Sequence, residues 1–191
     1  MSPAATAHSF ALFETPIGLC GIVWNSRGVT GLQLPEATAE RMRARIRRRW
    51  SDITESAPSP AVQRAIDRIL ALLQGEAVDL GDIVLDLEAA PDFHRRVYEV
   101  ARTIPPGQTM TYGEIARKLG VPHESREVGQ ALGRNPVAII VPCHRVLGAD
   151  GKMGGFSANG GVATKRRVLE IEGAAAVSAG PLFAGLQRRN V

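Results

Sequence analysis

Hydrophobic and polar residues alternate along the first third of the chain, a pattern that is typical of strands in an antiparallel sheet. Segments 8–14, 18–24 and 29–34 each alternate, and short runs of turn-forming residues separate them. We therefore expect three strands joined as a meander. A later short apolar run, 83–87, predicts one further strand.

Between these strands, two segments have the helical period. Residues 61–74 place their apolar side chains on one helix face. Residues 36–50 also predict a helix, which is rich in arginine: Arg41, Arg43, Arg45, Arg47, Arg48 and Arg49. A charge run of this kind usually forms a solvated helix face. A basic arm that binds DNA is the other interpretation.

The second half of the chain reads as short helices. Asp92 is a suitable N-cap for a helix at 93–103, which ends before Pro105 because proline cannot continue it. Thr111-Tyr112-Gly113-Glu114 has the residues of a capping box and begins another helix. A third helix is predicted at 125–132. Two short helices around a glycine-containing turn predict a helix-turn-helix, although such pairs also occur in cores that bind no nucleic acid.

An apolar run at 137–141 predicts a buried strand, and it ends at Pro142-Cys143-His144-Arg145-Val146. A thiol becomes a strong nucleophile only as a thiolate, so it needs a base or a positive field. His144 can supply the base and Arg145 the field. Adjacent strand side chains point to opposite faces, so Cys143 and His144 can cooperate only where the chain turns or a water carries the proton. A buried structural cysteine beside a surface histidine is the simpler interpretation of such a pair.

Composition and charge divide the chain into parts. It has 191 residues, of which 45% are hydrophobic, and two cysteines, too few for a disulfide framework. Residues 1–90 hold nine arginines, no lysine and eleven acidic residues, a net charge of −2, whereas 91–191 hold 14 basic and eight acidic residues, a net charge of +6. With the change of pattern at 89–91, we expect an N-terminal sheet and helix domain at 1–90, a second domain at 91–173 and a tail at 174–191. The basic excess favours a polyanionic partner.

The residues around the cysteine resemble a known family. The run Arg-Glu-Val-Gly-Gln-Ala-Leu-Gly-Arg-Asn-Pro at 126–136, followed by Ile-Val-Pro-Cys-His-Arg-Val at 140–146, closely resembles the active-site region of the O6-alkylguanine-DNA alkyltransferases, the methylated-DNA–protein-cysteine methyltransferases. The resemblance continues through Gly154-Gly155-Phe156-Ser157 and Lys165 to 169–173. It implies an α/β (α+β) fold, with a small antiparallel-sheet domain followed by a mostly helical, winged-helix-like domain that carries the helix-turn-helix and Cys143.

The function that this resemblance implies is DNA repair. The protein would flip O6-alkylguanine out of double-stranded DNA and transfer the alkyl group irreversibly to Cys143. A thioether is a poor leaving group, so each molecule would react once; activity on O4-alkylthymine stays open. No cofactor motif is present, and Cys20 with His8 falls short of four zinc ligands, so we expect neither cofactor nor metal. We expect a monomer, with cooperative DNA binding left open. No apolar run of membrane-spanning length and no secretory signal is visible. We therefore expect the protein to be cytoplasmic and, in a prokaryote, associated with the nucleoid.

The resemblance also assigns roles to catalytic residues. His144 would take the proton of Cys143 through a water, and Glu172 would hold the imidazole and stabilise its charged form. Glu170 is the local rival of Glu172 for this role. Asn135 would tie the recognition helix to the turn that carries the cysteine.

Further residues match positions that bind DNA or the base. Arg126 would enter the duplex and fill the gap left by the flipped base, while Tyr112 would help to rotate the nucleotide and would hydrogen-bond the extruded base. Small residues such as Gly129 would let the second helix approach the minor groove. The other expected contacts with DNA or base are Arg134, Val146, Phe156 and Ser157.

Several departures from the family pattern are visible. Glu127 stands where better-known relatives have a small residue, Ala138 replaces a proline of some members, Phe156 replaces a common tyrosine, and the loop 157–161 is about two residues longer than usual. The alternative function is a damage-recognition or regulatory protein of the same fold that transfers nothing; such members lack the cysteine. A Cys-His hydrolase would need an oxyanion hole, and no glycine-rich nucleophile turn is seen.

Overall fold

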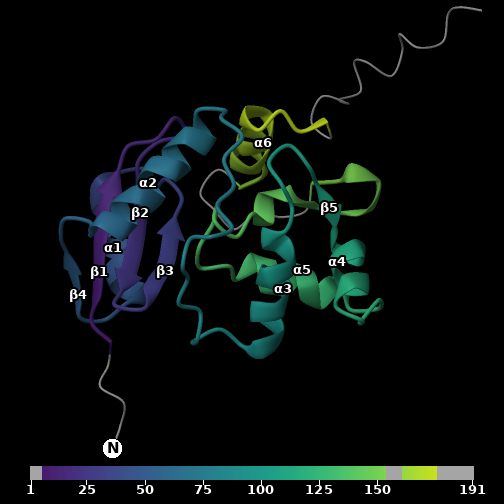
Figure 1. The fold of residues 1–191 in the computed structure, drawn as a ribbon, viewed down its shortest axis with the longest axis horizontal. Coiled ribbons are helices and arrows are strands. Elements are labelled where there is room, and N and C mark those ends of the chain that lie inside the picture. Colours follow the sequence, from purple (N-terminus) through teal and green to yellow (C-terminus); the bar gives the residue numbers. More distant parts are fainter. Residues whose placement is uncertain (1–5, 154–160, 176–191) are drawn as a thin grey trace, which may run out of the picture.

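The computed structural model describes residues 6–153 and 161–175. A four-stranded sheet forms its N-terminal part, in the order β3-β2-β1-β4 (Figure 1). Its strands are β1 (His8–Phe13), β2 (Cys20–Asn25), β3 (Gly28–Gln33) and β4 (Ile53–Glu55). The first three pair antiparallel, which confirms the predicted meander. The fourth pairs parallel to β1 and was not predicted, because three residues are too few to show an alternation.

Two helices cover the sheet, α1 (Ala39–Arg49) and α2 (Pro60–Leu73). Alternation along β2 sends Val23 into a small cluster with Met42 and Ile46 of α1. Its neighbour Ile22 belongs instead to the main core, which includes Ile66 of α2. The period of two in the strands and of 3.6 in the helices thus builds a layer on each face of the sheet.

The second half of the chain is mostly helical and lies beside the sheet (Figure 1). It contains α3 (Asp92–Arg102), α4 (Tyr112–Lys118), α5 (Ser125–Gly133), α6 (Gly161–Ile171) and a two-stranded parallel ladder of β5 (Met110–Thr111) with β6 (Val146–Leu147). The buried Tyr98 of α3 donates a hydrogen bond to the carbonyl of Ala131, 2.9 Å away. This bond fixes α5, the second helix of the helix-turn-helix, on α3. The predicted mixed fold is confirmed.

The capping prediction holds for α4 and fails for α3. Thr111 accepts a hydrogen bond from the backbone N–H of Glu114 at 3.2 Å, and the Glu114 carboxylate accepts from the backbone N–H of Thr111 at 2.6 Å, which is the expected capping box. The expected N-cap Asp92 is instead the first residue of α3; Pro91 occupies the cap position without a side-chain bond. The carboxylate of Asp92 pairs with Arg95 of the next turn.

Neither of the two later apolar runs forms a strand. In 83–87, Leu85 alone bridges to Val29, and Val84 is exposed. In 137–141, the buried chain folds into a tight loop, with Ile139 at a φ of 71°, a value that is rare for a β-branched residue. Apolar composition reports burial, and burial alone does not distinguish a strand from a loop whose polar backbone groups find other partners.

Candidate active site

The cysteine lies in a turn that follows α5 and the 137–141 loop. Cys143, His144 and Arg145 form a single turn of 3₁₀ helix. Adjacent side chains therefore no longer point to opposite faces of a strand, which meets the condition set by the sequence for cooperation between Cys143 and His144. The cysteine is 8% exposed and the histidine is fully buried.

Asn135 connects the end of α5 to the cysteine. Its side-chain amide donates to the carbonyl of Val141 at 2.9 Å and lies 3.3 Å from Sγ of Cys143, in donor position. Its oxygen accepts from the backbone N–H of Val137 at 3.0 Å. The backbone of the 137–141 loop thus finds in Asn135 the partners that a strand neighbour would have supplied. Leu32 of β3 also donates its N–H to the carbonyl of Pro136, at 2.9 Å.

A buried carboxylate holds the histidine. Nε2 of His144 lies 2.9 Å from Oε1 of Glu172, just after α6, while Nδ1 of His144 is buried without a hydrogen-bond partner in the described part of the chain. Arg145 binds the same carboxylate through two hydrogen bonds, donating to Oε2 at 2.9 Å and to Oε1 at 2.7 Å. It also donates to the carbonyl of Ile104 at 2.5 Å. The rival Glu170 is exposed.

These contacts set the protonation states of the cluster. Burial alone would raise the pKa of Glu172, but hydrogen bonds from His144 and Arg145 outweigh it and lower this pKa to about 2. Burial lowers the pKa of His144, against the opposing effect of Glu172. Burial raises the pKa of Cys143, with Asn135 and Lys165 acting in the opposite direction. At neutral pH the resting cluster therefore holds a thiol, a neutral imidazole and an ionised carboxylate.

The residues expected at the DNA lie on or beside the helix-turn-helix. Arg126 is exposed in the first turn of α5, and Tyr112 is half-buried at the start of α4. A Cβ added to Gly129 would lie 3.7 Å from the Tyr112 ring, so the two helices meet at this pair. Arg134 is exposed just after α5. Val146 is buried; its N–H donates to the Cys143 carbonyl and its own carbonyl accepts from Lys165.

Known proteins match this chain over most of its length. The methylated-DNA–protein-cysteine methyltransferase of Mycobacterium tuberculosis is 40% identical over 164 residues, which is 85% of this chain and 91% of the relative. The chain belongs to the methylated-DNA–protein-cysteine methyltransferase family. Residues 92–174 also match the family described as 6-O-methylguanine DNA methyltransferase, DNA binding domain. The family that the motifs predicted is thereby confirmed.

Solved structures of this methyltransferase family have the same fold. The M. tuberculosis protein in complex with DNA superposes with a TM-score of 0.73 at 36% identity, covering 89% of this chain and 98% of that one. The O6-methylguanine-DNA methyltransferase of Pyrococcus kodakaraensis gives a TM-score of 0.66 at 27% identity, covering 87% and 99%. DNA is thus a partner of a structural relative that spans nearly the whole of this chain.

Two features of this methyltransferase-family site were not assigned from the sequence. Lys165 of α6 is 1% exposed, donates to the Val146 carbonyl at 2.6 Å and has its ammonium 6.0 Å from the centre of the Tyr112 ring. Arg145 pairs with Glu172 rather than standing free beside the cysteine. The sequence of a motif does not reveal which group its lysine or arginine will contact. For Lys165 the available signal was the helical spacing of α6, which places Lys165 on the same buried face as Val168 and Leu169.

The structure bears differently on the remaining expectations, which concern the loop after residue 153, metal binding and membrane spans. Phe156 and Ser157, with most of the longer loop, lie outside the described residues. Within 6–153 and 161–175, no group of three or more His, Cys, Asp or Glu side chains is placed to hold a metal ion. No helix of that part combines the length and apolar composition needed to cross a bilayer.

Proposed function

We propose that this protein repairs DNA by transferring the alkyl group of O6-alkylguanine to Sγ of its own Cys143, once per molecule. The observation that carries the proposal is the hydrogen-bonded cluster at the end of the helix-turn-helix, in which Asn135 contacts Cys143 and Glu172 contacts His144. Residues 91–173 would perform both DNA binding and transfer. Residues 1–90 would support the loop before the cysteine through the hydrogen bond from Leu32 of β3 to Pro136. We propose that the protein acts as a monomer.

The proposed chemistry is a displacement at the alkyl carbon. The buried thiol gives its proton, through a water, to Nδ1 of His144, the ring nitrogen that has no partner among the described residues. The thiolate attacks the alkyl carbon; the S–C bond forms as the C–O6 bond breaks, and the electron pair leaves with guanine, which takes up the proton. Glu172 stabilises the transient imidazolium. The product thioether has no route back to a thiol.

Access to the base requires that it leave the duplex, because Cys143 is only 8% exposed and cannot reach the alkyl carbon of a base that stays in the stack. The exposed Arg126 at the start of α5 would fill the gap, and Tyr112 would face the extruded base. Gly129 and Gly133 leave the recognition helix without side chains at these positions, which suits a close approach to the minor groove. The solved complex of the M. tuberculosis relative with DNA supports DNA as the partner in this proposal.

The alternative, damage recognition without transfer, is not favoured by the site. It needs no nucleophile, whereas here a cysteine is present and contacts the Asn135 amide. A hydrolase would also use the cysteine, but it would release the alkyl group and turn over.

The number of lesions repaired by each molecule distinguishes the three functions. A duplex carrying O6-methylguanine is supplied in tenfold excess over protein, and restored guanine is counted by chromatography of the digested DNA. The proposal predicts a plateau at one guanine per protein molecule, and none with Cys143→Ser. Continued turnover would identify a hydrolase, and tight binding without any restored guanine would identify a recognition protein.

A further inference from the structure

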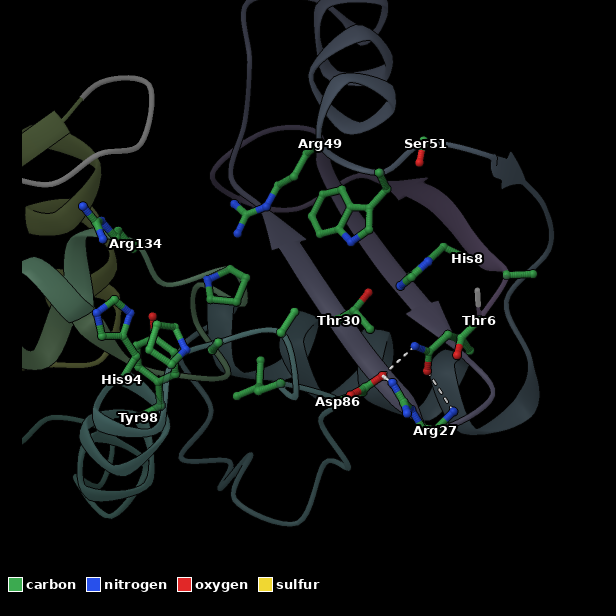
Figure 2. A pocket seen from close by; sticks show the side chains of 18 of the residues that line it. Thr6, His8, Arg27, Thr30, Arg49, Ser51, Asp86, His94, Tyr98 and Arg134 are labelled. Carbon is green, nitrogen blue, oxygen red and sulfur yellow. Dashed lines mark hydrogen bonds and ion pairs between the residues drawn. The ribbon is translucent and has the colours of Figure 1, made fainter. Parts of the chain in front are cut away.

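A cleft of about 830 Å³ lies between the sheet and α3, apart from the transfer cluster. Figure 2 shows side chains that line it from β1, β3 and α3, and from the segments that follow α1 and α5. Clefts of this volume hold small organic ligands in other proteins. Nothing in the proposed transfer reaction uses it.

Two arginines give this cleft a positive character. Arg49, at the end of α1, and Arg134 both line it, and neither forms an ion pair with a carboxylate in the part of the chain that the structure describes. Both also line a smaller cavity of about 170 Å³ that reaches Cys143. Both act on Tyr98 in the cleft wall: burial raises the pKa of Tyr98 to about 12, and the charges of these two arginines oppose that shift.

The carboxylates of the cleft do not neutralise these arginines. Asp86, at the opposite end in Figure 2, accepts from Asn25 at 2.6 Å and pairs with Arg27 at 2.9 Å. Asp52 is exposed at the rim. The positive charge at the Arg49 end is therefore available to an anion.

A buried hydroxyl in the wall of the cleft has no hydrogen-bond partner in the described part of the chain. Thr30 of β3 is 8% exposed, and its Oγ1 is buried without a hydrogen bond among the described residues. Figure 2 places it in the middle of the cleft, between Arg49 and the Arg27–Asp86 pair. A buried hydroxyl without a partner costs free energy, and a ligand that hydrogen-bonds it removes that cost.

An aromatic wall adjoins the arginine. The guanidinium carbon of Arg49 lies 5.0 Å from the centre of the Trp50 ring. The indole also packs on β3 at Gly31, where an added Cβ would lie 2.6 Å from its Cη2 atom. An arginine beside an aromatic ring is a common binding surface for a nucleobase that carries a phosphate.

We propose that this cleft binds a nucleotide, whose phosphate is held by Arg49 and whose sugar and base lie against Thr30 and Trp50. The Arg49 guanidinium, which forms no ion pair among the described residues, selects the phosphate. The Thr30 hydroxyl supplies a hydrogen bond, and the cleft volume exceeds that of an inorganic anion. A free nucleotide and a nucleotide unit of single-stranded DNA share this chemistry.

Calorimetric titration of the full-length protein tests the proposal. The ligands are dAMP, deoxyadenosine, inorganic phosphate and an oligodeoxyadenylate; adenine is used because an O6-alkylated guanine would also enter the cysteine pocket. Thr30→Val removes the hydroxyl at nearly constant volume, and Arg49→Gln removes one charge. Arg49→Gln is expected to weaken binding at least tenfold, the effect of one hydrogen bond to a charged group, and Thr30→Val about fivefold, the effect of one hydrogen bond between uncharged groups. Arg48→Gln, an exposed neighbour that does not line the cleft, is expected to bind like the parent protein.

Binding of dAMP at least tenfold tighter than deoxyadenosine and phosphate supports a free nucleotide as the ligand. Binding of the oligodeoxyadenylate alone, weakened by Thr30→Val and Arg49→Gln, supports a DNA strand as its source. The proposal is overturned when neither binds more tightly than deoxyadenosine, when phosphate alone binds as tightly as dAMP, or when both variants bind like Arg48→Gln.

Discussion

Glu172 is the residue on which the charge balance of the site depends. Its buried carboxylate accepts from His144 and from two nitrogens of Arg145. One anion thus contacts both a neutral ring, which would become a cation in the proposed transfer, and a permanent cation, which compensates the anion at rest. Without the Arg145 guanidinium, the buried charge of Glu172 would strongly lower the free energy of unfolding.

The pKa of Glu172 predicts how stability depends on pH. This pKa is about 2 in the folded protein, below its ordinary value of 4.5. A lowered folded-state pKa contributes stability that is complete above pH 4.5 and is lost as the pH falls toward 2; here it amounts to about 3 kcal/mol. Glu172→Gln should therefore be less stable than the parent in urea unfolding at pH 7, with the gap narrowing at pH 3. The control variant Glu170→Gln, at an exposed position, should be as stable as the parent protein at both pH values. A stability difference for Glu172→Gln that is the same at pH 7 and pH 3 would contradict the lowered pKa of Glu172.

Asn135 provides a second test at this scale. Its amide lies 3.3 Å from Sγ of Cys143 and lowers the pKa of that thiol, against the larger effect of burial. Asn135→Ala should react with free O6-methylguanine about tenfold more slowly at neutral pH, since one hydrogen bond to the thiolate is lost. The deficit should shrink as the pH rises, because the thiolate then forms without help. A deficit that is constant with pH would indicate a purely structural role.

At the scale of elements, caps and periodicity predicted the helices better than apolar runs predicted strands. The capping box at Thr111 located α4, because the box is a local interaction that four residues contain. β4 and the 137–141 loop were missed, because their form depends on distant partners: β1 for the former, and Asn135 and β3 for the latter. The resemblance likewise predicted that Glu172 holds the His144 ring, a contact that the structure contains, whereas the Arg145–Glu172 pair depends on how α6 packs and could not be predicted.

The position of Arg126 on α5 leads to a prediction about base flipping. It is exposed in the first turn of the recognition helix, away from the Cys143 cluster. Arg126→Ala should lose most repair of a methylated duplex, because nothing fills the gap left by the base. Its reaction with the free O6-methylguanine base should match that of the parent protein. Equal losses on both substrates, in a single-turnover rate measurement, would contradict this role.

At the scale of the whole molecule, the arginines of α1 are mostly engaged within the protein. Arg43 binds Glu55, Arg45 binds Glu36, and the guanidinium of Arg47 lies 5.7 Å from the centre of the Phe10 ring. These contacts support the interpretation of the helix as a solvated face. The segment 91–191, which carries the basic excess, by contrast contains the helix-turn-helix and the cysteine loop.

Replacing Arg45, Arg47 and Arg48 by glutamine should therefore change duplex affinity less than twofold and leave its salt dependence intact. Arg134→Gln, next to the recognition helix, should reduce the slope of log affinity against log salt by about one. Fluorescence anisotropy at several salt concentrations measures both. A large loss of affinity with a shallower slope in the triple variant would mean that α1 is a DNA-binding arm.

The proposed function depends above all on Cys143 itself receiving the alkyl group. The most direct measurement is the mass of the protein and of its Cys143 peptide after incubation with a duplex that contains O6-methylguanine. We expect a gain of one methyl group on the intact protein, located on Cys143. The peptide that contains the buried Cys20, whose pKa burial raises to about 12, should keep its mass. Repaired DNA with an unmodified Cys143, or a methyl group on any other residue, would contradict it.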